Sequence, residues 1–152
     1  MSFSVDATSA PMLRDLTSGC GAIVAGRRLF DRTDGWGDNH PAGAPVVVVT
    51  HRPRPADAAA RFPRTTFTGS VEEAITTAKG IAADKFVTIA SAYIIQQALK
   101  LGLVDEVCVS QVPVLFGSGV RYFGQLVGHV LLEDPVVVQG KRALHLRYPV
   151  RH

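Results

Sequence analysis

With 152 residues, 47% of them hydrophobic and 19% charged, the chain has the size and composition of one folded domain, spanning 1–152. Its apolar runs are too short to cross a bilayer, its first residues do not resemble an export signal, and Cys20 and Cys108 form no CxxC pair, so we expect a cytoplasmic protein. The net charge of +3 is spread without runs of like sign, and aromatic residues are sparse, which argues against nucleic-acid binding.

Helix and strand patterns alternate along the first half of the chain. A short helix is expected at 9–18, and the brief apolar run at 21–25 has the length of a buried strand. The four consecutive valines at 46–49 lack polar alternation, which is typical of a parallel strand that is covered on both faces. A further strand is expected at 65–68.

The alternation continues in the second half of the chain. Ser70 and Glu73 have the spacing of a capping box, in which the serine hydroxyl accepts a hydrogen bond from the Glu73 amide at the start of a helix. The apolar run at 86–90 predicts the next strand. Ser91 then begins a helix that Gly102 ends.

The C-terminal third has a different pattern. Residues 106–112 alternate between apolar and polar side chains, and the segments 130–138 and 143–148 indicate a final antiparallel pair. This order of elements predicts one three-layer α/β domain. Its mostly parallel sheet carries helices on both faces and is followed by a C-terminal antiparallel hairpin.

The ends of the predicted strands are the first place to look for a site, because ligands of open parallel sheets bind at the carboxyl ends of strands. The residues at three such ends are Gly26, Arg27 and Arg28; Thr50, His51 and Arg52; and Ala90, Ser91 and Ala92. The first two ends carry cations, and the third is a helix N-terminus whose free N–H groups favour an anion. The pattern indicates a groove for a phosphorylated ligand; the alternative is a set of solvated loop cations without a ligand.

The loop at 36–40 contains the candidates for proton transfer. Asp38 or His40 is a candidate proton donor, and Trp36 is a candidate for stacking on a planar ring. The alternative is a solvated turn, because Gly, Asp, Asn and Pro are turn residues. No grouping of histidine, cysteine and acidic residues has the spacing of a metal site.

Three segments of the chain resemble a known family. They are GAIVAGRRLFD at 21–31, WGDNHPAGAPVVVVTHRPRP at 36–55 and IIQQALKLGLVDEVCVSQVPVLFGSGVRYF at 94–123. These segments are similar to the dihydrofolate-reductase-like superfamily. The nearer resemblance is to the branch that contains the reductase domain of the bifunctional riboflavin-biosynthesis deaminase/reductase and its stand-alone bacterial relatives. The similarity extends over nearly the whole chain, and its most specific part is 102–106 followed by 113–119.

The resemblance implies an NADPH-dependent reductase, usually dimeric in this branch, that transfers hydride to a small heterocyclic or carbonyl substrate. It also implies roles for the strand-end residues. Gly26, Arg27 and Arg28 match the turn at the adenosine-side phosphates, Thr50, His51 and Arg52 match the loop that binds the 2′-phosphate, and Ile89, Ala90, Ser91, Ala92 and Ile94 belong to the stretch that cradles the pyrophosphate. Gly117 and Gly119 match a bend on the substrate side; from the residues alone, a tight turn is equally compatible.

Two features depart from the family pattern. Relatives open with an additional strand and a Ser/Asp-rich segment that border the nicotinamide and the substrate, and this chain is expected to begin after that strand. Where relatives carry Gly-Gly, this chain has Ala90 and Ser91, whose Cβ atoms crowd the phosphates. Ser91 then either donates its hydroxyl to a phosphate or serves only as an N-cap. These departures predict weakened or lost NADPH binding and leave open a catalytically degenerate, dimeric binding or scaffold domain of the same fold.

Overall fold

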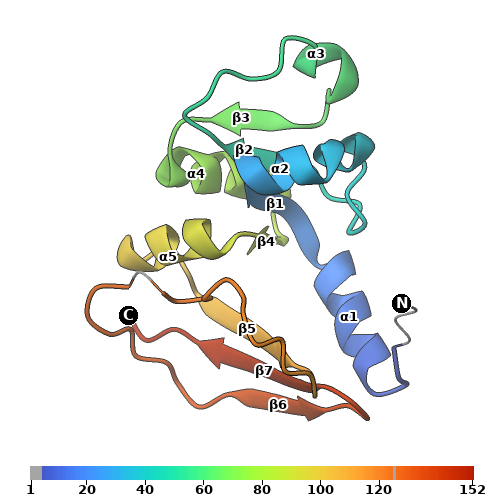
Figure 1. Cartoon of the computed structure of the whole chain (residues 1–152), viewed down its shortest axis with the longest axis vertical. Helices are drawn as coiled ribbons and strands as arrows, with labels where there is room; N and C mark the ends of the chain where they lie inside the picture. The colour runs from blue at the N-terminus through green and yellow to red at the C-terminus, as the bar shows by residue number, and fades with distance from the viewer. Residues whose placement is uncertain (1–4, 125) are drawn as a thin grey trace.

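A four-stranded parallel sheet forms the centre of the fold (Figure 1). In the computed structural model, which describes residues 5–124 and 126–152, the strands of this sheet are β1 (Cys20–Gly26), β2 (Val46–Val49), β3 (Thr66–Thr68) and β4 (Phe86–Ile89). They lie in the order β3-β2-β1-β4, so β1 is paired on both sides and β4 lies at one edge.

The helices are connected to this sheet by short loops. They are α1 (Ser9–Ser18), α2 (Arg27–Arg32), α3 (Ala58–Arg61), α4 (Val71–Ala82) and α5 (Ala92–Lys100), together with the 3-10 turn η1 (Asp34–Asp38). The amide of Glu73 donates to Ser70 Oγ over 3.1 Å, which confirms the predicted start of α4. Within the described ranges, none of these helices combines the length and the apolar character that crossing a bilayer requires.

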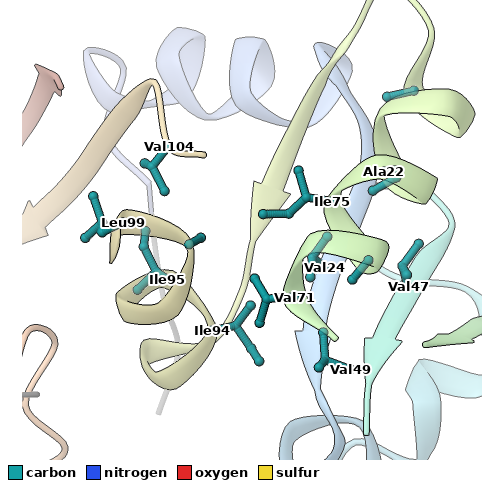
Figure 2. Packing of buried hydrophobic residues seen from close by; sticks show 14 of the residues in the cluster. Ala22, Val24, Val47, Val49, Val71, Ile75, Ile94, Ile95, Leu99 and Val104 are labelled. Carbon is teal, nitrogen blue, oxygen red and sulfur yellow. The ribbon is translucent and has the colours of Figure 1, made fainter. Parts of the chain in front are cut away.

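One core lies between the parallel sheet and helices α4 and α5 (Figure 2). Helix α4 buries Val71, Ala74, Ile75 and Ala78, which are spaced at i, i+3, i+4 and i+7 and therefore lie on one face. These α4 side chains pack against side chains of β1 and β2, among them Val24 of β1, which is fully buried. Removal of this apolar surface from water stabilises the layer by about 25 cal/mol per Å².

A second core covers the opposite face of the same sheet. The ring of Phe30 in α2 makes edge-on contacts with Phe62, at a centroid distance of 4.9 Å, and with Phe67, at 5.3 Å. Val48 belongs to this core, whereas Val47 belongs to the other, and both side chains are 0% exposed. The unbroken valine run is therefore covered on both faces, as its sequence predicts, and the expected layered α/β fold is confirmed.

The C-terminal strands form a separate antiparallel sheet. Its strands are β5 (Glu106–Gln111), β6 (Val136–Gln139) and β7 (Leu144–Pro149), in the order β5-β7-β6. The predicted hairpin is present as β6 and β7, and β5 pairs with β7 from Glu106↔Pro149 to Gln111↔Leu144. Membership of β5 in this sheet agrees with its apolar–polar alternation, because antiparallel strands commonly have one buried face.

Strands β4 and β5 each keep one edge without a strand partner in the described part of the chain. β4 pairs with β1, and β5 pairs with β7. Although β4 is apolar, Phe86 is 44% exposed, and its neighbours Val87 and Ile89 are only partly buried. The incomplete coverage of β4 follows from its position at the edge of the sheet.

Gly21 tests the packing of β1 on α4. Gly21→Ala is expected to lower the free energy of unfolding by roughly 1–3 kcal/mol, as overpacking does. The added Cβ would lie 2.7 Å from the Cα of Ala82 and 2.8 Å from its carbonyl oxygen.

Gly80→Ala is the matched control in α4, because nothing lies within 4 Å of its added Cβ. The control is expected to raise the free energy of unfolding by about 0.5–1 kcal/mol. Urea unfolding measures both changes, and equal stability of the two variants would contradict this packing.

Candidate cofactor and substrate site

The parallel register brings three strand ends to one edge of the sheet. Gly26 at the end of β1 lies opposite Val49 of β2, and Val24 lies opposite Ile89 of β4. The amide of Ala90 donates to the carbonyl of Val24 over 2.8 Å, which fixes the chain as it leaves β4. The segments that follow these three strands therefore start side by side, as the sequence predicts for a ligand-binding edge.

Arginines from two of these segments converge on Asp31. Arg27 Nε donates to Asp31 Oδ1 over 2.7 Å, and Arg52 Nη2 donates to Asp31 Oδ2 over 2.8 Å. Hydrogen bonds from Arg27 and then Arg52 lower the pKa of Asp31, so this carboxylate is ionised at neutral pH. An open hollow of about 580 Å³ is lined by Arg28, Asp31, Arg32 and Arg52. With three guanidinium groups and one carboxylate, the hollow keeps a positive charge and can bind an anion.

Sequence reasoning missed Asp31 and Arg32 in this hollow. The spacing of Arg27 and Asp31, at i and i+4, could have indicated their ion pair, because residues at this spacing are neighbours on a helix surface. Thr50 shapes the adjacent loop, since its hydroxyl accepts a hydrogen bond from the amide of Arg52 over 3.0 Å. His51 is exposed on the same loop.

The third predicted segment begins α5. Ser91 occupies the N-cap position, but its side chain makes no capping hydrogen bond. A Cβ placed on Gly26 would lie 3.2 Å from Ser91 Oγ, so the Ser91 hydroxyl faces the end of β1. Because the first turn of a helix leaves its N–H groups unpaired, Ala92 and Ile94 contribute backbone donors here, whereas the Ile94 side chain is buried in the core.

The two candidate proton donors have different surroundings. Asp38 Oδ2 accepts a hydrogen bond from the amide of Arg64 over 2.9 Å, and Asp38 Oδ1 accepts one from Thr65 Oγ1 over 3.0 Å. Both carboxylate oxygens of Asp38 thus hold a neighbouring loop. The backbone of η1 has positive φ from Asp34 to Asp38, and Gly35 fits there between the rings of two phenylalanines.

His40 is half-buried and is one of the residues that line a cavity next to β4. Its Nδ1 accepts a hydrogen bond from the amide of Ala42 over 3.1 Å, so the neutral ring carries its proton on Nε2. Burial lowers the pKa of His40. The ring lies 4.7 Å from that of Trp36, edge to face, which means that Trp36 packs on His40.

A cavity of about 810 Å³ lies beside the open edge of β4 and extends to β5. Its apolar wall comes from α4, α5 and β4, and His40 and Thr88 are among its polar groups. This volume lies within the range of small-molecule sites, roughly 300–1,000 Å³. Gly117 and Gly119 do not line this cavity, and no atom lies within 4 Å of a Cβ placed on either. Tyr122, which sequence reasoning missed, does line it, and burial raises the pKa of its hydroxyl.

The β5 side of the cavity holds an ion pair and a thiol. Arg147 donates to both carboxylate oxygens of Glu106, over 3.0 Å each, and Cys108 Sγ donates to Glu106 Oε1 over 3.3 Å. Burial, assisted by the Glu106 carboxylate, raises the pKa of Cys108 to about 11. The thiol is therefore protonated at neutral pH and is not an activated nucleophile. Among the described residues, no group of histidine, cysteine and acidic side chains has the arrangement of a metal site.

One protein family and several solved structures resemble this chain over most or all of its length. The family model of the RibD C-terminal domain matches residues 6–139. A structure described as a riboflavin biosynthesis protein from Shewanella sp. PV-4 is 21% identical and superposes with a TM-score of 0.71, covering 100% of this chain and 84% of the other. The riboflavin biosynthesis reductase of Saccharomyces cerevisiae is 12% identical, with a TM-score of 0.68 and coverage of 96% and 82%.

A pyrimidine reductase-like protein from Corynebacterium diphtheriae is 16% identical, with a TM-score of 0.61 and coverage of 97% and 82%. No curated protein sequence matched the chain. At these identities the structures support the dihydrofolate-reductase-like fold, while the family model covers most of the chain. The chain therefore belongs to the family of the RibD C-terminal domain, the riboflavin-biosynthesis reductase family.

Proposed function

We propose that this chain, acting as one domain, is an NADPH-dependent reductase that transfers hydride to a small heterocyclic or carbonyl substrate. Membership of the reductase family supports the reaction class. The observation that carries the cofactor assignment is the arginine hollow at the ends of β1 and β2, where Arg28, Arg32 and Arg52 surround Asp31. When bound, NADPH supplies the hydride.

The arginine hollow fits the 2′-phosphate, the group that distinguishes NADPH from NADH. A guanidinium group can hold two phosphate oxygens at once, and the Asp31 carboxylate fixes the orientation of Arg27 and Arg52 before a ligand arrives. Arg27 is fixed further because its Nη1 donates to the carbonyl of Pro53 over 2.8 Å. Gly26 and the loop that contains Thr50 and His51 complete the proposed binding site for the adenosine part of NADPH.

The pyrophosphate is assigned to the start of α5. The N–H groups of Ala92 and Ile94 and the hydroxyl of Ser91 are donors of the kind that bind phosphate oxygens at helix N-termini. Ile89 and Ala90 lead from the end of β4 into this segment. The Cβ atoms of Ala90 and Ser91 narrow the approach compared with a glycine pair, so we expect modest cofactor affinity.

His40 is proposed as the proton donor on the substrate side. Its ring lines the cavity and carries its proton on Nε2, and Trp36 holds it in place by an edge-to-face contact. A neutral imidazole of this kind can donate a hydrogen bond to a substrate oxygen or nitrogen, or relay a proton from water. Asp38 is the weaker candidate because both its oxygens already bind the loop at 64–65.

We also propose that the protein is a cytoplasmic homodimer. Large apolar side chains between β5 and β6 are exposed, among them Leu115 at 101%, Phe116 at 79% and Val127 at 90%. A second copy would remove such a surface from water. The thiols of Cys20 and Cys108 are free, as a reducing compartment would keep them.

A catalytically degenerate binding domain is the second candidate function. The features that favour it are the Cβ atoms at Ala90 and Ser91 and the half-exposed strand β4. The two candidates differ in one property that can be measured directly, because the reductase must bind NADPH and the degenerate domain need not.

NADPH at millimolar concentration is expected to raise the melting temperature, whereas NADH is expected to have little effect. Ligand at 100 times its Kd adds about 2.7 kcal/mol to the free energy of unfolding. Arg52→Ala is expected to abolish most of this shift in melting temperature. The control is Arg14→Ala, at an exposed arginine in α1; it removes the same charge and is expected to leave the shift unchanged. Thermal melts of the three proteins test this, and an absent shift in the unaltered chain would favour the degenerate domain.

The buried position of His40 predicts a contribution to stability that depends on pH. Because burial lowers its pKa, the unfolded chain binds a proton more readily at this residue, so the contribution is present at pH 7.5 and is lost as the pH falls below the ordinary value, about 6.5. His40→Gln is expected to reduce the loss of unfolding free energy between pH 7.5 and 5.5. Denaturant unfolding of this variant and of His129→Gln, an exposed histidine, measures the difference. The same pH dependence in both would contradict the proposed environment of His40.

A further inference from the structure

A chain of hydrogen bonds joins the start of α1 to the second sheet, away from the arginine hollow. Ser110 Oγ on β5 lies 2.9 Å from His145 Nδ1 on β7, its direct neighbour across the two strands. His145 Nε2 lies 3.0 Å from Ser9 Oγ, and Ser9 Oγ donates to Asp6 Oδ2 over 3.0 Å. Figure 1 shows α1 beside the end of the sheet where β6 and β7 are connected.

The Asp6 carboxylate sets the direction of every bond in this chain. Hydrogen bonds, above all from the amide of Ser9, lower the pKa of Asp6, so it is ionised and only accepts. The single hydroxyl proton of Ser9 goes to Asp6, so Ser9 Oγ must accept the Nε2 proton of His145. His145 Nδ1 is then an acceptor in the neutral ring, and the Ser110 hydroxyl donates its proton to it.

The two middle members of this chain, Ser9 and His145, are buried, and Ser110 is accessible. Ser9 is 3% exposed and His145 is 6% exposed, whereas Ser110 is an exposed residue. Asp6 also accepts from the amide of Lys141 over 3.1 Å. A Cβ on Gly140 would lie 2.5 Å from Ser9 Oγ, so glycine is required where the turn between β6 and β7 passes over this chain.

We propose that Ser110 is a nucleophile that accepts the acyl group of small carboxylic esters, with His145 as its general base. An accessible hydroxyl, a histidine that accepts its proton and a buried group that orients the histidine are the three parts of a nucleophilic serine site. Ser9 and Asp6 are positioning residues, because they act on Ser110 through His145. This site shares no residue with the proposed cofactor site.

The reaction would proceed in two balanced steps. Ser110 Oγ forms a bond to the ester carbonyl carbon, its proton moves to His145 Nδ1, and the bond to the leaving alkoxide breaks as that proton is transferred to it. Water then attacks the carbonyl carbon of the acyl-serine and gives a proton to His145. The bond between that carbon and Ser110 Oγ breaks as His145 returns the proton to Ser110 Oγ, and the carboxylic acid leaves. The open edge of β5 presents alternate backbone N–H groups that can donate to the oxyanion formed in each step.

The surroundings of Ser110 indicate where the acyl group would lie. Glu106, Cys108 and Ser110 alternate along β5 and therefore project from the same face. Glu106 and Cys108 line the large cavity, so Ser110 is the next residue of that face beyond it. The nearby Cys108 is the rival nucleophile, but its raised pKa, about 11, keeps the thiol protonated.

The test uses the full chain with 4-nitrophenyl acetate and, separately, a fluorophosphonate probe. We expect a burst of one 4-nitrophenolate per chain and one label, which peptide mass mapping assigns to Ser110. Ser110→Ala is expected to abolish the burst and the label, and Ser18→Ala, an exposed serine at the end of α1, is expected to keep both. Label found on Cys108 or on lysine, with Ser110 unmodified, would overturn the proposal.

Ser9→Ala distinguishes two roles of Ser9, which are to orient the base His145 and only to stabilise the fold. It is expected to slow acylation roughly 100-fold, the lower range for general-base catalysis. The final amplitude should remain one per chain, because the fold and Ser110 are retained, and circular dichroism provides the check on folding. An unchanged acylation rate in folded Ser9→Ala, or a lost amplitude together with lost helical signal, would assign this hydrogen-bond chain a purely structural role.

Discussion

The pairing of β1 with both β2 and β4 is the constraint on which the candidate cofactor site depends. Because both pairings are parallel, the segments after Gly26, Val49 and Ile89 begin at one edge of the sheet. Strand β2 can take its central position because Val47 and Val48 are buried on opposite faces of the sheet. A slip of one residue would exchange the two faces and would also move the arginines of the site.

Local patterns were sufficient to predict most of this framework. The unbroken valines indicated a strand covered on both faces, and the Ser70–Glu73 pair located the start of α4, both as observed. The clustering of Arg27 and Arg52 could also be predicted, because the carboxyl ends of parallel strands meet at one edge. Each of these inferences depends on residues close in sequence or on a general rule of sheet topology.

The remaining features depend on contacts between distant segments. Asp38 and His40 lie two residues apart in one loop, and sequence alone could not rank them. Both carboxylate oxygens of Asp38 accept hydrogen bonds from residues 26 and 27 positions away in the sequence, whereas the His40 ring lines a cavity formed by other elements. Likewise, the contact of His145 with Ser9 spans 136 residues. No local spacing rule describes such a contact, and only the fold reveals it.

The open edges of β4 and β5 influence which ligands the large cavity can accept. Unpaired backbone N–H and C=O groups at such edges are hydrated, and a purely apolar ligand that displaced the water would leave them unsatisfied at a cost of about 1–3 kcal/mol each. A ligand with alternating donors and acceptors replaces these hydrogen bonds as a neighbouring strand would. The heterocyclic or carbonyl substrate proposed here meets this condition, because its ring N–H or C=O groups can pair with a strand edge while its planar face contacts the apolar wall from α4 and α5.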